Sequence, residues 1–243
     1  MPEGPTIIIT KEDASQFAGK EITSVSGNTK IDLDRLNHKK VNWFKSWGKH
    51  FLIGFDDFTV RIHFLLFGSY LVNDTKTANA RLGLTFKSGF INFYACHVKI
   101  LEGDINDYYD WSADVMNDDW NPRKAKSKLK NAPKTLICDA LLDQEIFGGV
   151  GNIIKNEVLY RVRIHPESEV GKIPTKKLTD IINEARSYSF DFLKWKKKGE
   201  LKKHWLAHAK KVYHRCNLPI IKKYTGVKKR RSFFCERCQK LHV

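Results

Sequence analysis

The residues at the start of the chain have the chemistry of a nucleophile beside an acid. Pro2 becomes a free secondary amine if Met1 is removed, and Glu3 places a carboxyl group next to it. An α-amino group has a pKa of about 7.7–8.0, so roughly a tenth of it is neutral at pH 7. A neutral secondary amine can attack a sugar carbon and form an iminium, as in Schiff-base catalysis. In a bare Met-Pro start, however, Pro2 more often only stabilises the chain end.

A glycine-rich turn is predicted to present a helix N-terminus to an anion. Gly149 and Gly151 precede a segment predicted to be helical, with Asn152 as its N-cap. Glycines let another backbone approach closely, and the free N–H groups of a helix N-terminus attract phosphate. An ordinary turn between two helices has the same sequence, so this motif alone is a weak indication.

Three of the five cysteines lie near the end of the chain. Cys235 and Cys238 form a Cys-x-x-Cys pair, which is half of a zinc ribbon, and Cys216 lies upstream. The odd number of cysteines and the lack of a visible signal peptide indicate a reducing compartment. In such a compartment a cysteine cluster is more typical of a metal site than of disulfides.

The elements that must position these residues fall into two patterns. A helix is predicted at residues 3–18, followed by short strands separated by turn residues, which is typical of a sandwich or barrel. The predicted strands are 21–25, 41–47, 50–55, 59–66, 69–72, 82–86, 90–95 and 98–101.

After Tyr109 the pattern becomes helical. The predicted helices are 122–131, 134–143, 152–160, 175–198 with Thr175 as its cap, and 200–209. The predicted fold is therefore α+β and multidomain. It has a β-sandwich domain with an N-terminal helix at 1–112, a helical domain at 113–209 and a zinc-ribbon-like β-hairpin finger at 210–243.

The positive charge is concentrated at the C-terminal end. The net charge is +16, and residues 194–243 contain 17 lysines and arginines but only two acidic residues. A polyanion partner fits this surplus, because each neutralised phosphate releases counterions. A solvated basic tail is the alternative, but Trp195, Trp205, Tyr213, Phe233 and Phe234 argue against disorder. No run of 18 apolar residues occurs, so no membrane span is predicted.

An ordered set of motifs resembles one family over essentially the whole chain. The set is Met1-Pro2-Glu3-Gly4-Pro5, Gly48-Lys49, Leu142-Asp143-Gln144 with Gly149-Val150-Gly151-Asn152, and Arg230 before Cys235-Glu236-Arg237-Cys238-Gln239. Together these motifs resemble the formamidopyrimidine-DNA glycosylase / endonuclease VIII family. The resemblance implies a helix–two-turn–helix motif in the helical domain, a monomer, and double-stranded DNA with a damaged base or abasic site as partner.

The resemblance also implies roles for the matching residues. Pro2 would attack C1′ of the damaged nucleotide and leave an imine, while Glu3 shuttles protons. Lys49 would contact a flanking phosphate and assist proton transfer. Asn152 and Arg230 would hold phosphates, for which the planar arginine side chain is suited. The implied activity is that of a DNA glycosylase and AP lyase of base excision repair, acting by β- and δ-elimination.

The metal site departs from the pattern of most relatives. In most relatives another Cys-x-x-Cys pair lies upstream of the pair that corresponds to Cys235 and Cys238. Here Cys216 is present upstream, but Tyr213 stands where its partner cysteine is expected. We expect structural zinc bound by Cys216, Cys235 and Cys238 with His214 as the fourth ligand, since zinc accepts Cys₃His sets. His208 is a weaker candidate, and a metal-free finger held by packing is the alternative.

The lesion preference follows from the segment that aligns with the family's wedge. Leu65, Leu66 and Phe67 form an apolar tip that resembles the endonuclease VIII-like branch, whereas an Arg-Arg-Phe-type wedge of the purine-lesion branch is missing near residues 93–98. Inserted apolar side chains offset part of the cost of flipping a base. Oxidised pyrimidines, or ring-opened lesions, are therefore the expected substrates in preference to 8-oxoguanine. A core strand is the alternative interpretation of the tip.

Other features leave alternatives open. Thr6 stands where many relatives have glutamate, and His63 and His97 are expected to be structural. The rival functions are a non-catalytic binder of damaged DNA on the same fold and, less favoured, a zinc-ribbon RNA-binding protein. The expected location is the cytoplasm if the source is bacterial and the nucleus if it is eukaryotic.

Overall fold

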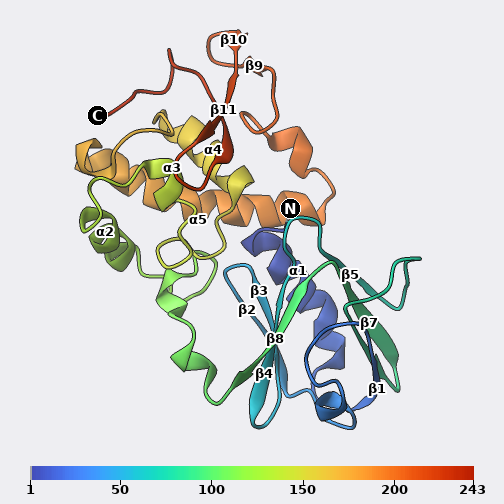
Figure 1. Ribbon diagram of the computed structural model, residues 1–243. Coiled ribbons are helices and arrows are strands. Elements are labelled where there is room, and N and C mark those ends of the chain that lie inside the picture. Colours follow the sequence, from blue (N-terminus) through green and yellow to red (C-terminus); the bar gives the residue numbers. More distant parts are fainter. Residues whose placement is uncertain (1) are drawn as a thin grey trace. The chain divides into compact units, whose positions relative to one another are not determined.

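The chain folds into two compact units, one ending at Tyr109 and one spanning Asp110–Val243 (Figure 1). The computed structural model describes residues 2–243, and Met1 lies outside the described residues. The second unit holds both the helical region and the C-terminal hairpins, which the sequence predicted as separate domains. The three-domain division at residues 112 and 209 stays a prediction.

The first unit begins with a helix and continues as strands. Helix α1 spans Gly4–Ala14 and is followed by a 3-10 turn at Ser15–Phe17, so together they match the predicted helix. The strands are β1 (Ile22–Ser26), β2 (Trp43–Trp47), β3 (His50–Gly54), β4 (Phe58–His63), β5 (Ser69–Val72), β6 (Leu82–Phe86), β7 (Gly89–Tyr94) and β8 (His97–Glu102). Each predicted strand is present within a few residues of its expected bounds.

These strands form a sandwich of two antiparallel sheets. One sheet has the order β1-β6-β7-β5 and the other β2-β3-β4-β8. The core between them contains fully buried side chains from both sheets, including Phe51 and Phe93, whose rings lie 5.6 Å apart. Helix α1 packs against β2 and β3 through residues such as Ile7. The predicted β-sandwich with an N-terminal helix is confirmed.

The second unit is helical before its hairpins. Its helices are α2 (Pro122–Lys130), α3 (Ile137–Ala140), α4 (Asn152–Val162) and α5 (Thr175–Lys197). Two hairpins follow, formed by β9 (Val212–Tyr213) with β10 (Leu218–Pro219) and by β11 (Ile221–Thr225) with β12 (Arg230–Phe234). The predicted helical domain and terminal hairpin finger are thus confirmed as elements of the fold.

Two predicted helices of this unit are shorter than expected. The segment 134–143 is helical only at Ile137–Ala140, because Leu136 pairs with Glu169 as an isolated bridge and the Ile137 N–H donates to the Ser168 carbonyl. The segment 200–209 contains only a 3-10 turn at Leu201–His204. Backbone N–H groups that would continue this helix donate to a buried carboxylate instead, as described below.

Two predicted helix caps are wrong by one residue. Gly151 caps α4 and Pro174 caps α5, so Asn152 and Thr175 are the first helical residues. The Asn152 amide is engaged by another element, which removes it from capping. Among residues 2–243, no helix is long and apolar enough to cross a membrane.

Candidate functional site

The N-terminal pair is attached to a rigid element. Glu3 is the N-cap of α1, its carbonyl accepts from the Thr6 and Ile7 N–H groups at 2.8 and 3.3 Å, and Pro5 stands within the first turn. Glu3 is fully buried and Pro2 is partly exposed. A nucleophile at Pro2 would therefore be one residue away from a fixed helix, beside a carboxyl group shielded from bulk water.

Lys49 lies in a tight turn between β2 and β3. Trp47 pairs with His50, and Gly48 has a φ of +54°, a left-handed conformation that glycine adopts readily. The Lys49 ammonium is close enough to help lower the pKa of both His50 and His63. The turn therefore places the Lys49 side chain at the end of the β2-β3-β4-β8 sheet.

Strand register brings the apolar tip to the same end of this sheet. His50, next to Lys49, pairs with His63, the last residue of β4 before the tip. Leu65, Leu66 and Phe67 are 52%, 51% and 88% exposed. They lie outside any strand, so the alternative of a core strand is wrong.

The backbone around the apolar tip forms a closed turn. The Gly68 N–H donates to the Phe64 carbonyl at 2.8 Å, and a Cβ on Gly68 would lie 2.1 Å from that oxygen. Phe64 itself is buried in the core, with 2% of its surface exposed. The sequence therefore buries one aromatic ring as an anchor and presents three apolar side chains beyond it.

The histidines beneath this edge predict acid sensitivity. Burial lowers the pKa of His50 to about 3, with further lowering by the charges of Arg61, His63 and Lys49. Histidine in the unfolded chain has a pKa near 6.5, so the unfolded chain binds more protons than the folded chain between pH 6.5 and 3. The stability therefore decreases as the pH is lowered through this window. We expect His50 alone to contribute a loss of about 3 kcal/mol to the unfolding free energy of the first unit between pH 7 and pH 4, at ~1.4 kcal/mol per unit, as measured by urea denaturation.

His50→Asn should remove most of that pH dependence. His38, whose side chain is 76% exposed, gives the matched control, and His38→Asn should leave the pH dependence as it is. An unchanged slope in His50→Asn would contradict the argument.

In the second unit, the turn before α4 is held by one side chain. Gln144 donates from Nε2 to the Leu142 and Val150 carbonyls, both at 3.1 Å, and its Oε1 accepts from the Gly149 N–H at 3.1 Å. Gly149 has a φ of +93°. This interlocked turn directs the first residues of α4, including Asn152, toward the β11–β12 hairpin.

Asn152 and Arg230 are brought together through a shared neighbour. Asn152 Nδ2 donates to the carbonyl oxygen of Arg231 at 3.0 Å, and Arg230 is the residue before it. Asn152 is 7% exposed, and its buried Oδ1 has no hydrogen-bond partner among residues 2–243. Arg230 is half-buried at the start of β12.

The β11–β12 turn is anchored by a buried carboxylate. Asp139 accepts from the Val227 and Lys228 N–H groups at 2.9 and 3.2 Å. A Cβ on Gly226 would lie 2.3 Å from an Asp139 oxygen, so only glycine fits this approach. The hairpin that carries Arg230 is thus fixed at its tip as well as along β12.

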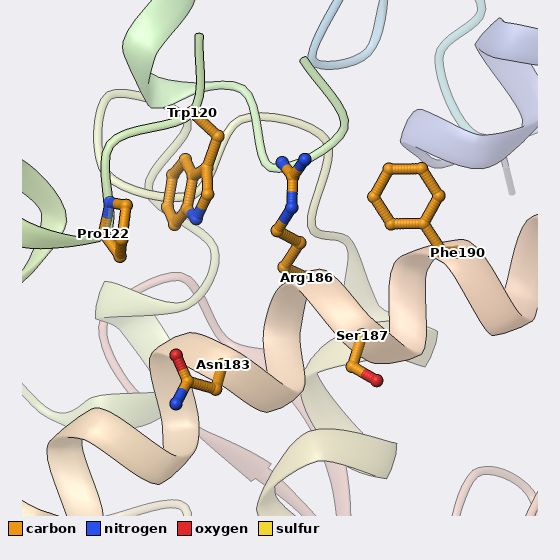
Figure 2. Close-up of a pocket in the computed structure, with 6 residues that line it drawn as sticks. All are labelled: Trp120, Pro122, Asn183, Arg186, Ser187 and Phe190. Carbon is orange, nitrogen blue, oxygen red and sulfur yellow. The ribbon is translucent and has the colours of Figure 1, made fainter. Parts of the chain in front are cut away.

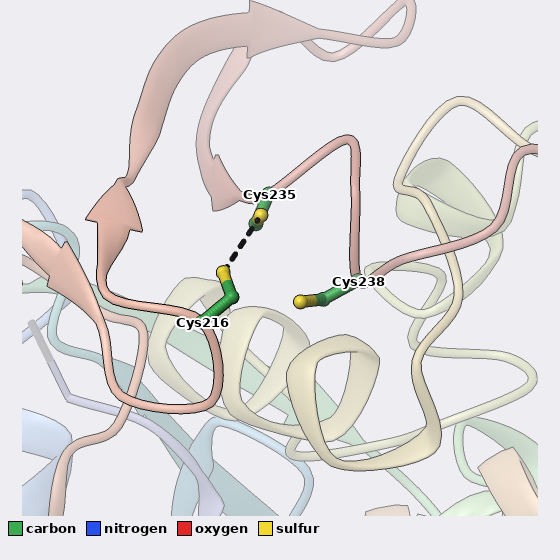
Figure 3. Close-up of side chains that lie close together, drawn as sticks. All are labelled: Cys216, Cys235 and Cys238. Carbon is green, nitrogen blue, oxygen red and sulfur yellow. Dashed lines mark hydrogen bonds between the residues drawn. The ribbon is translucent and has the colours of Figure 1, made fainter.

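The three C-terminal cysteines form one cluster (Figure 3). The sulfurs of Cys216, Cys235 and Cys238 all lie within 4.8 Å of one another, and the Cys216 and Cys235 sulfurs are 3.7 Å apart. Sulfurs of a tetrahedral zinc site are about 3.8 Å apart, given Zn–S bonds of about 2.3 Å. The cluster therefore has the spacing of a metal site.

The structure does not bring the expected fourth ligand into this cluster. His214 is exposed and is not part of the group found among residues 2–243. His208 lies elsewhere, with its ring 5.1 Å from that of Phe233 and its Nδ1 3.3 Å from Asn156. The spacing of the three thiols fits a zinc ion, and the fourth ligand remains a prediction.

Tyr213 is a core residue of the finger. It is fully buried, and its ring centroid lies 4.5 Å from that of Tyr160 on α4. The Arg215 guanidinium lies 4.3 Å over the Tyr160 ring and donates to the Tyr160 carbonyl at 2.7 Å. At the position where most relatives have a cysteine ligand, this chain thus has an aromatic side chain that packs the finger against α4.

A separate pocket of about 480 Å³ lies along α5 (Figure 2). It is lined by Trp120, Pro122, Asn183, Arg186, Ser187 and Phe190. Arg186 donates to the Val115 and Asn117 carbonyls at 2.8 and 2.9 Å, so its guanidinium ties α5 to that segment. The pocket contains none of the predicted site residues.

The fold and these elements define a class of protein. Residues 112–191 match the family described as the formamidopyrimidine-DNA glycosylase H2TH domain. This range contains α2–α4 and most of α5, including the glycine turn and Asn152. This region is therefore similar to the formamidopyrimidine-DNA glycosylase / endonuclease VIII family, as the motifs predicted.

Individual relatives and structures agree with this family. Endonuclease 8-like 3 of Mus musculus is 29% identical over 202 residues, covering 79% of this chain and 33% of the relative. A viral DNA glycosylase structure has a TM-score of 0.84 at 23% identity, covering 98% of this chain and 100% of that one. The Lactococcus lactis formamidopyrimidine DNA glycosylase, bound non-covalently to AP-site DNA, has a TM-score of 0.87 at 20% identity, covering 98% and 99%.

The similarities cover most of this chain but a much smaller part of the curated relatives. The structural likenesses show the fold, and the chain spans little more than a third of the length of the curated relatives it matches first. These comparisons confirm the predicted resemblance to the formamidopyrimidine-DNA glycosylase / endonuclease VIII family. The roles of Pro2, Glu3, Lys49 and the DNA-binding residues remain predictions.

The sequence analysis missed three polar residues of α4. Lys155, Asn156 and Glu157 are 0%, 1% and 0% exposed. Lys155 and Asn156 contact β12 of the finger, and Glu157 contacts the segment of residues 206–208 that precedes the finger. The available signal was a run of three polar residues between the apolar pairs Ile153-Ile154 and Val158-Leu159 of one helix. Whether such polar residues are exposed or buried depends on which segments pack against each face of the helix.

Proposed function

We propose that this chain is a bifunctional DNA glycosylase and AP lyase that acts through the Pro2 amine. The observation that carries the proposal is the N-terminal pair: Pro2 leads directly into a fixed helix and Glu3 is fully buried beside it. Removal of Met1 is required, since a retained Met1 would leave the Pro2 nitrogen as an amide.

The reaction follows from this pair. The neutral Pro2 nitrogen attacks C1′, the bond from C1′ to the base breaks, and the base leaves with a proton. Glu3 supplies a proton to O4′ as the sugar ring opens, and the nitrogen lone pair forms the iminium. Loss of a C2′ proton then expels the 3′ phosphate, and a second elimination expels the 5′ phosphate. Water finally hydrolyses the imine and releases Pro2.

The proposed partner is double-stranded DNA with a damaged base or an abasic site. The basic C-terminal region supports it, as does the Lactococcus lactis relative bound to AP-site DNA. Asn152 and Arg230 would bind phosphates, and Lys49 would contact a phosphate beside the lesion. We place the protein among intracellular repair enzymes that act as monomers, in the nucleus or the cytoplasm according to its source.

Borohydride trapping on a duplex with one abasic site tests the proposal. Borohydride reduces an imine to a stable amine, so the natural protein should form a covalent adduct with the DNA. Pro2→Gly should form much less adduct, and a form that retains Met1 should form none. DNA binding without any adduct from the natural protein would leave a non-catalytic binder of damaged DNA.

The apolar tip is proposed to fill the space left by the flipped base, with oxidised pyrimidines as substrates. Replacing Leu65, Leu66 and Phe67 together by alanine should lower kcat/KM on a paired lesion about tenfold or more, because flipping costs a few kcal/mol. The fold should be unaffected, since all three side chains are largely exposed. The same lesion in single-stranded DNA is the control and should be cleaved at nearly the natural rate; an equal loss on both substrates would contradict the role.

The three thiols are proposed to bind one structural zinc with His214 or another fourth ligand. When bound, zinc would hold the β9–β10 turn to the end of β12 and take no part in bond cleavage. We expect about one zinc per chain by elemental analysis, and Cys238→Ser should lose most of it. His214→Ala distinguishes the fourth ligand: unchanged zinc content would exclude His214. A metal-free natural protein with three titratable thiols would support the packed finger instead.

A further inference from the structure

Helix α4 carries three consecutive buried polar side chains that contact either β12 of the finger or the segment just before the finger. Glu157 accepts from the N–H groups of Leu206, Ala207 and His208 at 2.8 to 3.0 Å. Lys155 and Asn156 contact β12 instead. One turn of helix thus fixes two separate segments of the chain by dedicated polar contacts.

The contacts to β12 converge on one backbone carbonyl. The Arg231 oxygen accepts from Asn152 Nδ2 at 3.0 Å, from Asn156 Nδ2 at 3.3 Å and from Lys155 Nζ at 3.4 Å. Arg230 is the preceding residue. The carbonyl therefore joins the first residue of α4 to the strand residue next to Arg230.

Lys155 extends this junction across the hairpin. Its Nζ also contacts Ser232 Oγ at 2.8 Å, and that hydroxyl lies 2.6 Å from Thr225 Oγ1 on β11. Thr225 pairs with Arg230 in the strand register. The ammonium group is thus linked through the Ser232 hydroxyl to Thr225 of β11, which pairs with Arg230 at the start of β12.

Lys155 is placed where a positive charge is costly. Lys155 is fully buried within the first turn or so of α4, where the helix dipole disfavours a positive charge and burial adds a desolvation cost. A positive charge at a helix N-terminus does favour an anion bound beside it. We propose that Lys155 is a positioning residue that sets the spacing of Asn152 and Arg230, so that both bind phosphates of one DNA strand.

This inference rests on the proposed function, because it assumes that Asn152 and Arg230 contact DNA. Lys155→Met keeps the length of the side chain and removes its charge and hydrogen bonds. Glu157→Gln is the matched control, since it removes a buried charge from the same helix turn without touching β12. Ser232→Ala removes the β12 partner of the ammonium and serves as a milder second variant if Lys155→Met folds poorly.

The experiment measures the Kd for an abasic-site duplex over a series of salt concentrations, together with the trapping rate at saturating DNA. We expect Lys155→Met to raise Kd about tenfold and to reduce the salt slope by about 0.9 for one lost phosphate contact. The trapping rate at saturation should change less than twofold. Ser232→Ala should shift Kd in the same direction, and Glu157→Gln should leave the salt slope unchanged.

The outcomes separate the two levels of inference. Equal Kd and salt slope for Lys155→Met and the natural protein would overturn the positioning role. A salt slope reduced as much by Glu157→Gln as by Lys155→Met would also overturn it, because both variants would then act through the stability of the finger. DNA binding without adduct in the natural protein would instead reject the catalytic proposal and leave the binding comparison valid.

Discussion

Glu3→Gln should lower the rate of base removal by about 10²- to 10⁴-fold, the usual contribution of a positioned general acid–base group. Glutamine has nearly the same shape but cannot give or take a proton. The native carboxyl group is fully buried at the N-cap of α1, next to the Pro2 nitrogen in the chain. Water is therefore poorly placed to replace it. Single-turnover kinetics on a duplex with one oxidised pyrimidine measure the effect.

The control is an acidic residue of the same helix outside the proposed site. Glu12 is exposed near the end of α1, and Glu12→Gln should leave the rate within twofold of the natural protein. Thermal denaturation of both variants separates catalysis from folding, because Glu3 is buried. A rate for correctly folded Glu3→Gln within threefold of the natural protein would remove Glu3 from the mechanism.

Tyr213→Ala should destabilise the second unit by about 3–5 kcal/mol, as expected for removal of a fully buried aromatic side chain. The residue is 0% exposed and packs against Tyr160 with the two rings tilted by 44°, and Cys235 and Ala207 lie in the same cluster. Its loss leaves a cavity between the finger and α4. At ~1.4 kcal/mol per factor of ten, this loss reduces the folding equilibrium constant of the unit by a factor of about 10² to 4 × 10³. Denaturant unfolding of the natural and variant proteins measures it.

Two variants separate packing from metal binding at this position. Tyr213→Phe keeps the ring and removes only the hydroxyl contact to Arg215 at 3.3 Å, so it should cost about 1 kcal/mol. Tyr213→Cys would add a thiol three residues before Cys216. If Tyr213→Ala unfolds at the same denaturant concentration as the natural protein, the cysteine cluster holds the finger by itself. A Tyr213→Cys variant as stable as the natural protein, with raised zinc affinity, would show that a fourth thiol can replace the packing.

These two residues illustrate how well sequence alone predicts the site. Glu3 and Pro2 are adjacent in the chain, so their pairing needs no tertiary contact to be recognised. In the sequence Tyr213 is recognisable as an aromatic residue of the basic region and as a missing ligand, but its packing on Tyr160 is not, because Tyr160 is 53 residues away. The cysteines were grouped correctly, but the exposure of His214 depends on how the β9–β10 turn lies.

The same distinction holds for the elements. The strands of the first unit were predicted closely, because alternating apolar residues and turn residues are local signals. The helix predicted at 200–209 was wrong beyond His204, because the Glu157 carboxylate captures the N–H groups of residues 206–208. Asn152 was predicted as a cap, but its amide donates to the Arg231 carbonyl from a strand 79 residues away.

The sequence by itself determined the order of motifs, the sandwich followed by helices and a basic finger, and the resemblance to one family. Those properties rest on neighbouring residues and on composition, which the chain carries in any conformation. Only the tertiary structure decided that Leu65–Phe67 is an exposed turn rather than a core strand, that Tyr213 replaces a ligand by packing, and that Lys155 lies buried beneath the strand of Arg230. Burial and polar pairing join distant segments, so their free energies are defined only once the chain has folded.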